Sequence, residues 1–405
     1  MALYQGPPFA SHCIHGYDMA ATIWQLLFVD DDPDFCRQVQ EFLDGETIPP
    51  GDRLQVQTLN DFGDALNELE VHRFDLLILD VRLGPHSSTP DEEAGITTLQ
   101  AIQQRRFIPV VFYTGLPNLV RHLVTPLIQV VEKTEELPRL LDSLKSIFAT
   151  RVPAVNRALI RHLETIQREY MWDFVANHWE QLSDTSDHTS LAYLLARRLA
   201  TSLSGSGIQQ LTQELGDSTG TAVTEGHVHP MRYYVVPPVE PAPLAGDIYQ
   251  GQVGEHNGYW ALLTPSCDMV TGREKAELVL LARCFPLTEQ AEYQQWRDGL
   301  PAPSRTINSK LQDLLRNNRR DSQSERFFFL PGALSLPDLL VDFQQLVTLQ
   351  RDHISGLERL ASLDSLFAEA LLARFARYFG RLGTPDLDVT VLLQRLRAVT
   401  GERTA

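Results

Sequence analysis

Three aspartates stand directly after apolar runs, at positions where their carboxylates could act together. Asp30 and Asp31 follow the run WQLLFV, and Asp80 follows the run FDLLIL. Crowded carboxylates repel one another unless a hard divalent cation joins them, and Mg²⁺ prefers such oxygen ligands. With that ion bound, Asp80 could act as a nucleophile towards a phosphoryl group and form an acyl phosphate.

Two further polar residues follow apolar runs and complete this chemistry. Thr114 comes directly after IPVVFY, and Lys133 comes shortly after LIQVV. The metal and the Lys133 ammonium can neutralise charge that develops on phosphoryl oxygens, and the Thr114 hydroxyl can hydrogen-bond one of those oxygens. The five side chains together predict a site that accepts a phosphoryl group.

The apolar runs that precede these residues have the length and composition of buried parallel strands. Apolar residues at helical spacing lie between the runs, which indicates right-handed βαβ crossovers. We therefore predict an α/β fold, a doubly wound five-stranded parallel sheet. Its carboxyl edge would gather the five polar residues, because ligands of such sheets bind beyond the carboxyl ends of the strands. The predicted strands are 24–29, 54–59, 74–79, 108–113 and 127–131.

Four segments in this order, VDDDPDF, LLILDVRLG, VVFYTG and VVEKTEEL, resemble the motifs of response-regulator receiver domains. The resemblance covers residues 24–149 and implies the flavodoxin-like receiver fold. It also implies the ligands of Mg²⁺. Asp31 and Asp80 would bind the ion directly, together with the backbone carbonyl of Arg82, and Asp30 would assist through water.

The same resemblance implies the roles of the remaining site residues. Asp80 would be phosphorylated by a partner histidine kinase, Thr114 would be the switch hydroxyl, and Lys133 would contact the phosphate. Two positions depart from the family pattern. Thr134 stands where a proline usually follows the lysine, and Val130 stands where an aromatic residue usually precedes it.

The connections near the site also differ from the usual pattern. Lys133 lies only 19 positions after Thr114 in the sequence, so we expect the fourth helix to be about one turn long. The segment 81–95, by contrast, should be a long polar loop. These differences predict that phosphorylation is read out in an unusual way.

The remaining chain changes character several times. Pro153 opens a long amphipathic helix, and a second helix is expected around residues 191–202. Short β-like runs from Tyr233 onward predict a small barrel or a twisted antiparallel sheet, and an apolar stripe from Leu357 to Phe379 predicts a terminal helix. The predicted organisation is a flexible tail (1–22), a receiver domain (23–150), a helical linker (151–215), a β-rich domain (225–352) and C-terminal helices (353–405).

Composition excludes some classes of protein. No run of 18 apolar residues exists, so no membrane association is expected. The four cysteines are widely spaced, which is typical of a reduced, cytoplasmic protein. A net charge of −17 argues against nucleic-acid binding. The main basic cluster, between Arg305 and Arg326, is best interpreted as a solvated helix and loop.

One local sequence in the C-terminal region could do chemistry of its own. In TPSCDM, Cys267 and Asp268 end a strong apolar strand. Cys267 could be a nucleophile with His227, His229 or His256 as its base, or it could join Cys284 and two of those histidines in a zinc site. A structural cysteine is the simpler interpretation. The chain is therefore not expected to be an enzyme beyond its own phosphorylation and dephosphorylation.

These observations favour a response regulator of a bacterial two-component system whose atypical, non-DNA-binding C-terminal region relays the signal to an unknown downstream protein. Two alternatives remain. The receiver could be a phosphate sink for a shared kinase, in a setting such as an antiviral defence operon, or phosphorylation could gate an enzyme that uses Cys267. A homodimer is also compatible with the sequence.

Overall fold

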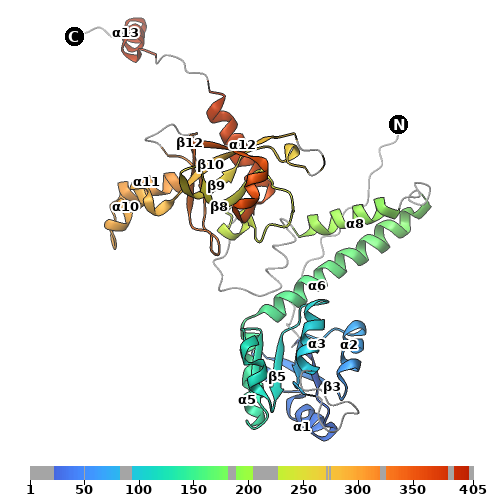
Figure 1. Cartoon of the computed structure of the whole chain (residues 1–405). Coiled ribbons are helices and arrows are strands. Elements are labelled where there is room, and N and C mark those ends of the chain that lie inside the picture. Colours follow the sequence, from blue (N-terminus) through green and yellow to red (C-terminus); the bar gives the residue numbers. More distant parts are fainter. Residues whose placement is uncertain are drawn as a thin grey trace. The chain divides into compact units, whose positions relative to one another are not determined.

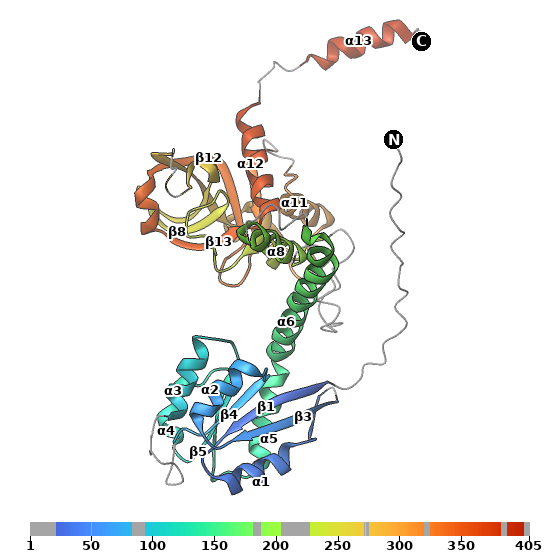
Figure 2. The same ribbon diagram turned by 90° about the vertical axis from the view of Figure 1, so that its right-hand side faces the viewer.

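The computed structural model describes residues 22–49, 51–82, 94–180, 188–203, 227–270, 272, 275–319, 325–381 and 387–400. The chain divides into two compact units, Met1–Gly220 and Thr221–Ala405, and each is described by itself. Within the described residues, no helix has both the length and the apolar character that a membrane span requires. Figures 1 and 2 show the elements of both units.

The first unit is built on a mostly parallel sheet with the strand order β2-β3-β1-β4-β5-β6. Five strands pair in parallel, which confirms the predicted doubly wound sheet. The two-residue strand β2, which pairs antiparallel with β3 at one edge, was not predicted. The strands are β1 (Ile23–Val29), β2 (Thr47–Ile48), β3 (Asp52–Leu59), β4 (Leu76–Leu79), β5 (Val110–Thr114) and β6 (Ile128–Glu132).

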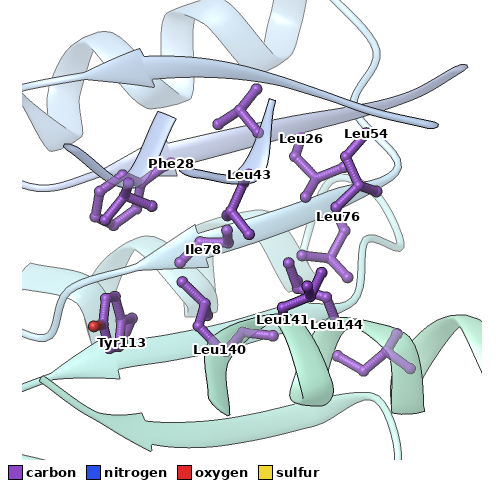
Figure 3. Packing of buried hydrophobic residues seen from close by; sticks show 14 of the residues in the cluster. Leu26, Phe28, Leu43, Leu54, Leu76, Ile78, Tyr113, Leu140, Leu141 and Leu144 are labelled. Atoms are coloured by element: carbon purple, nitrogen blue, oxygen red, sulfur yellow. The ribbon is translucent and has the colours of Figure 1, made fainter. Parts of the chain in front are cut away.

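Helices cover both faces of this sheet because its strands carry apolar side chains on both sides. Leu26 and Phe28 of β1 pack into one core with α1 and α5 (Figure 3), whereas Leu27 and Val29 pack into a second core with α2, α3 and α4. Such two-sided burial is what a doubly wound fold requires. The helices are α1 (Pro33–Leu43), α2 (Phe62–Val71), α3 (Ala94–Gln103), α4 (Pro117–Val120) and α5 (Leu137–Ala149).

The helix termini follow from local sequence. The Asp32 side chain accepts hydrogen bonds from the backbone N–H groups of Asp34 and Phe35, and Pro33 occupies the first turn of α1. The prediction of a one-turn fourth helix is confirmed, since α4 has four residues and continues only as a short 3₁₀ turn, η1 (Arg121–Leu123). The predicted loop 81–95 lies largely outside the described residues.

A helical pair follows the sheet within the first unit. Helix α6 (Val152–Glu169) continues through a π-helical segment, η2 (Tyr170–Val175), and a 3₁₀ turn, η3 (Ala176–His178). The second helix is α8 (His188–Ser202), so both helices predicted for this region are present. His162 of α6 is buried, and its Nε2 lies 3.2 Å from the carbonyl oxygen of Ser202, which ties the two helices together.

The second unit contains an antiparallel sheet with the strand order β11-β12-β10-β9-β8-β13-β7. The sheet curves so that its two edges approach each other. The Tyr234 hydroxyl of β7, at one edge, donates a 2.7 Å hydrogen bond to the carbonyl of Pro331, which follows β11 at the other edge. This agrees with the predicted twisted sheet. The strands are β7 (Tyr234–Val235), β8 (Asp247–Val253), β9 (His256–Leu262), β10 (Leu278–Pro286), β11 (Phe327–Leu330), β12 (Leu339–Gln350) and β13 (Glu358–Leu363).

Helices and short turns complete the second unit. Figure 1 places α10 and α11 beside the sheet, and a separate core beneath them contains Leu311 and Leu314 of α11. The helices are α10 (Ala291–Asp298), α11 (Arg305–Leu315), α12 (Ser365–Phe379) and α13 (Val389–Thr400), and the 3₁₀ turns are η4 (Pro230–Tyr233), η5 (Ser266–Asp268), η6 (Leu287–Glu289) and η7 (Arg351–Gly356).

The prediction of helix throughout Leu357–Phe379 was wrong in its first part. Residues Glu358–Leu363 form strand β13, which pairs with β8 and contains a register shift between Arg359 and Ala361. A short apolar stretch fits either periodicity, and here the open edge of β8 selects the strand. Helix α12 begins only after Asp364, whose side chain caps it. The region 353–405 is thus not purely helical.

Candidate functional site

The three predicted aspartates meet at the carboxyl edge of the first sheet. Asp30 and Asp31 follow β1, and Asp80 follows the neighbouring strand β4. One carboxylate oxygen of each lies within 4.8 Å of the others. All three are buried, with exposed fractions of 0%, 8% and 7%. Among the described residues, this is where histidine, cysteine or acidic groups are close enough to hold a metal ion together.

Lys133 supplies the positive charge of this cluster. Its Nζ lies 2.5 Å from Asp30 Oδ2 and 2.8 Å from Asp80 Oδ2. Lys133 follows β6, and its backbone N–H donates to the carbonyl of Thr114 on β5, which fixes where the side chain begins. The ammonium also lies 4.9 Å from the ring centroid of Phe35. The cation is therefore held against the carboxylates from two sides.

Thr114 lies at the end of β5 and is almost completely buried. Its hydroxyl oxygen accepts a 3.1 Å hydrogen bond from the backbone N–H of Leu116. This bond orients the oxygen, and the hydroxyl proton is committed to no other described residue. A threonine held in this way can donate to an additional acceptor at the edge of the sheet.

The backbone around Asp80 is tightly constrained. The N–H of Val81 donates a 2.6 Å hydrogen bond to Asp80 Oδ1. Gly95, at the start of α3, donates its own N–H to the Val81 carbonyl, and a Cβ at this position would lie 2.0 Å from the Asp80 carbonyl oxygen. Only glycine permits this approach. Sequence reasoning missed Gly95, since a glycine in the first turn of a helix carries no signal of a distant backbone contact.

The electrostatics of the cluster are those of an acidic site with too little positive charge. Burial raises the pKa of Asp30 to about 6, and the adjacent Lys133 only partly offsets that effect. Burial alone would lower the pKa of Lys133, yet Asp30 and Asp80 outweigh it and the pKa is raised. Three carboxylates thus face one ammonium.

A buried oxygen in this cluster is without a partner. Among the described residues, Asp31 Oδ2 accepts no hydrogen bond and is shielded from solvent. Burying an unpaired carboxylate oxygen is costly, so its retention is expected where a ligand supplies the missing contact. The donor set, which is all carboxylate oxygen, fits a hard divalent cation such as Mg²⁺.

Two residues behind the cluster support the main chain and were not predicted. The Cys36 thiol lies 3.3 Å from the Asp30 carbonyl, and the Asn60 amide donates to the same oxygen at 3.1 Å. Burial raises the pKa of Cys36 to about 12, with the Asp30 charge adding to the effect. The thiol is therefore unreactive and acts as a packing group.

The positions that depart from the family pattern lie beside the cluster. Val130 is half-buried in β6 and packs against the core formed with α2, α3 and α4. Thr134 is exposed in the turn after Lys133. Arg82 is also exposed, two residues after Asp80, and its carbonyl remains a predicted metal ligand.

Comparison with known proteins agrees with this geometry. The family model of the response regulator receiver domain matches residues 26–145. No curated protein matches the chain. Residues 26–145 are a response regulator receiver domain of two-component signalling.

Solved receiver structures resemble the same part of the chain. The regulator TrrA of Thermotoga maritima, solved in complex with Mg²⁺–BeF, is 20% identical, with a TM-score of 0.25 and coverage of 31% of this chain and 98% of its own. A CheY-like receiver domain from Methylobacillus flagellatus is 20% identical, with a TM-score of 0.24 and coverage of 31% and 99%. The chemotaxis regulator CheY4 of Vibrio cholerae is 21% identical, with a TM-score of 0.24 and the same coverage.

The residues proposed for a second site do not come together. Cys267 is exposed in the turn η5, and its contact is with Asp268 Oδ1, 3.6 Å away. Cys284 is buried in the core, which raises the pKa of its thiol. His229 uses Nδ1 to accept from the backbone N–H of Met231. The described residues show neither a histidine base at Cys267 nor a zinc cluster there.

Two arginines of the basic cluster in the second unit are paired with carboxylates. Arg319 donates through two nitrogens to Glu292, at 2.7 and 2.9 Å. Arg326 makes a similar two-point contact with Asp342, at 2.7 and 2.6 Å. Paired guanidinium groups offer little free charge to a nucleic acid, in keeping with the interpretation of this segment as a solvated helix and loop.

Proposed function

We propose that Asp80 accepts a phosphoryl group from a histidine kinase in an Mg²⁺-dependent reaction. The observation that carries this proposal is the buried cluster of three carboxylates, with Lys133 Nζ 2.8 Å from Asp80. Structural ion pairs usually balance their charges, whereas this cluster has an excess of negative charge and an unpaired oxygen on Asp31. That excess of negative charge supports a role in binding a cation and accepting a phosphoryl group.

The metal ligands would be Asp31, Asp80 and the Arg82 carbonyl, with Asp30 acting through water. When bound, Mg²⁺ would supply positive charge that offsets the carboxylates and the incoming phosphoryl oxygens. Asp30 tends to bind a proton near pH 6 when no metal is present, because it is buried. The cation would therefore also keep Asp30 ionised.

In the transfer step, a carboxylate oxygen of Asp80 attacks the phosphorus of the kinase phosphohistidine. The P–N bond breaks, and its electron pair leaves with the imidazole, which takes up a proton. The Lys133 ammonium lies close enough to Asp80 to contact a phosphoryl oxygen once the acyl phosphate forms. The Thr114 hydroxyl is free to donate to another phosphoryl oxygen, which would report the modification to β5.

The signal would leave the receiver through the junction of α5 and α6. The Trp24 ring of β1 packs at a tilted angle against Phe148 of α5, with ring centroids 5.0 Å apart, and the Arg157 guanidinium of α6 lies 4.0 Å from the same Trp24 ring. Arg157 also forms an ion pair with Asp75, just before β4. Since α4 is one turn long, this junction is the better route to the C-terminal unit, which would act on a protein partner.

The test is phosphorylation of the full chain by acetyl phosphate or a cognate kinase with Mg²⁺. We expect incorporation of one acid-stable, base-labile phosphoryl group that disappears in Asp80→Asn and without divalent metal. Asp75→Asn is the matched control, since it alters a half-buried aspartate at the other end of the sheet and should retain phosphorylation. Persistent labelling of Asp80→Asn would contradict the proposal. If deletion of the C-terminal unit abolishes the pathway response, the result favours relay of the signal through that unit over a phosphate sink.

A further inference from the structure

A cavity opens at the amino ends of the parallel strands, on the opposite edge of the sheet from the acidic cluster. Its volume is about 480 Å³. Residues that begin β1 or precede β4 and β5 form one wall, and helix α6 forms the other. The volume falls within the range of about 300–1,000 Å³ that is typical of small-molecule sites. It shares no residue with the acidic cluster.

The cavity has a substantial apolar surface. Phe107 is 47% exposed and Ile23 is 52% exposed, although both precede or begin buried strands. The buried Phe74 and Ile160 of α6 also line the cavity. Large apolar side chains that are exposed to solvent within a cavity are typical of a ligand site. Single exposed apolar residues scattered over a surface do not indicate such a site.

The polar lining carries an excess of positive charge. Arg157 is paired with Asp75, and Arg73 lies 2.7 Å from Glu164. These two pairs leave Arg106 without a carboxylate among the described residues; it donates only to backbone carbonyls. Arg161 on α6 likewise has no described carboxylate partner. The cavity lining thus has two guanidinium groups more than it has carboxylates, although the whole chain has a net charge of −17.

We propose that this cavity binds a small organic anion with a flat apolar body, such as an aromatic carboxylate, sulfonate or phosphate. Arg106 and Arg161 would bind the anionic group, because guanidinium groups form strong charge-assisted hydrogen bonds with planar and tetrahedral oxyanions. Phe107 and Ile160 would cover the apolar body. The ligand would touch both the receiver strands and α6, so its binding would hold the helix in its docked position.

The experiment compares two probes with the same naphthyl and phenyl rings, measured on the full chain. One is 8-anilino-1-naphthalenesulfonate, which carries an anionic group, and the other is the neutral N-phenyl-1-naphthylamine. We expect the sulfonate to bind with a stoichiometry near one and more tightly than the neutral probe. Arg106→Gln with Arg161→Gln should weaken sulfonate binding about tenfold or more, the loss of a charge-assisted contact, and change binding of the neutral probe little.

Two further variants separate a built site from general affinity. Phe107→Ser should weaken binding of both probes. The charge-matched control is Arg37→Gln with Arg139→Gln, which removes two exposed arginines from outside the cavity and should leave both affinities unchanged. Equal sulfonate affinity in the cavity variants and the control, or no preference for the sulfonate over the neutral probe, would overturn the proposal. Neither result would bear on phosphorylation of Asp80, which is assayed separately.

Discussion

Both units of this protein bury aspartates, but they treat the buried charge differently. In the receiver domain, Asp30, Asp31 and Asp80 face the single ammonium of Lys133. One of their oxygens has no described partner, and burial raises the pKa of Asp30 to about 6. The charge there is unbalanced in the absence of a ligand.

The sheet of the second unit buries Asp247 completely, yet pairs it with a matching cation. Arg359 contacts the carboxylate through Nε at 2.8 Å and Nη2 at 3.0 Å. The Ser362 hydroxyl and the Leu244 N–H each donate to it at 2.7 Å. This carboxylate needs no further ligand.

The difference is the one expected between the proposed phosphoryl-acceptor cluster and a structural ion pair. A buried carboxylate that is fully hydrogen-bonded contributes to a defined packing arrangement, although its net effect on stability can be small. Buried carboxylates that outnumber their cations raise the free energy of the folded protein until a cation binds. The two units should therefore respond in opposite directions when a buried aspartate is neutralised.

The largest effect is expected for Asp247→Ala. The substitution leaves the half-buried Arg359 guanidinium without its counter-ion, and breaking a buried ion pair typically costs about 3–5 kcal/mol. Chemical denaturation monitored on the second unit should show this loss. Asp298→Ala, which removes an exposed partner of Arg297, is the control and should change the unfolding midpoint little. Equal stability of the two variants would contradict the view that the buried charge of Asp247 is balanced by Arg359.

Asp30→Asn should do the reverse in metal-free buffer and stabilise the receiver domain. The folded pKa of about 6 lies above the ordinary value of 3.8, so the native state favours the protonated carboxyl. The protonated Asp30 carboxyl contributes fully to the stability of the wild type below about pH 4, and this contribution is lost as the pH rises through about 6. We expect the variant to be more stable by about 2 kcal/mol near pH 8, with a smaller gain near pH 4.

Added Mg²⁺ sharpens this prediction. Binding to the wild-type cluster should offset the charge excess, so the advantage of Asp30→Asn should shrink or reverse at millimolar Mg²⁺. The measurement is the free energy of unfolding across the pH range, with and without the metal. A variant less stable than the wild type at high pH without metal would show that Lys133 already balances the cluster.

Ser362→Ala should have a moderate effect. The hydroxyl is buried and donates to Asp247, and it also lies 3.1 Å from Arg359 Nη2. Removing the hydroxyl leaves the ion pair intact but deletes these two hydrogen bonds, so we expect a loss of about 1–2 kcal/mol. A double variant with Asp247→Ala should lose less than the sum of the single losses, since the two side chains share one network.

The smallest effect is expected for Cys267→Ala. The thiol is exposed, and its described contact is a long one to the neighbouring Asp268. Stability should change by less than about 0.5 kcal/mol, and phosphorylation at Asp80 should be unchanged. Loss of the biological response in this variant, with normal phosphorylation, would instead restore the hypothesis of an enzyme that uses Cys267.

The acidic cluster could be predicted from the sequence because each of its residues follows an apolar run, and parallel strands bring their carboxyl ends to one edge. The short α4 followed from the spacing of Thr114 and Lys133. Gly95 could not be predicted, since its requirement comes from the Asp80 carbonyl, a residue fifteen positions earlier. The strand β13 was missed because its edge partner β8 lies more than a hundred residues away.

The sequence by itself determined the receiver fold, its five parallel strands and the identity of its acidic residues, because strand length and periodicity are local properties. Only the tertiary structure decided which buried charges are balanced. Arg359 and Asp247 pair across the sheet of the second unit, whereas Asp31 keeps an oxygen without a described partner. Charge balance depends on distances between residues far apart in the chain, and no local pattern records those distances.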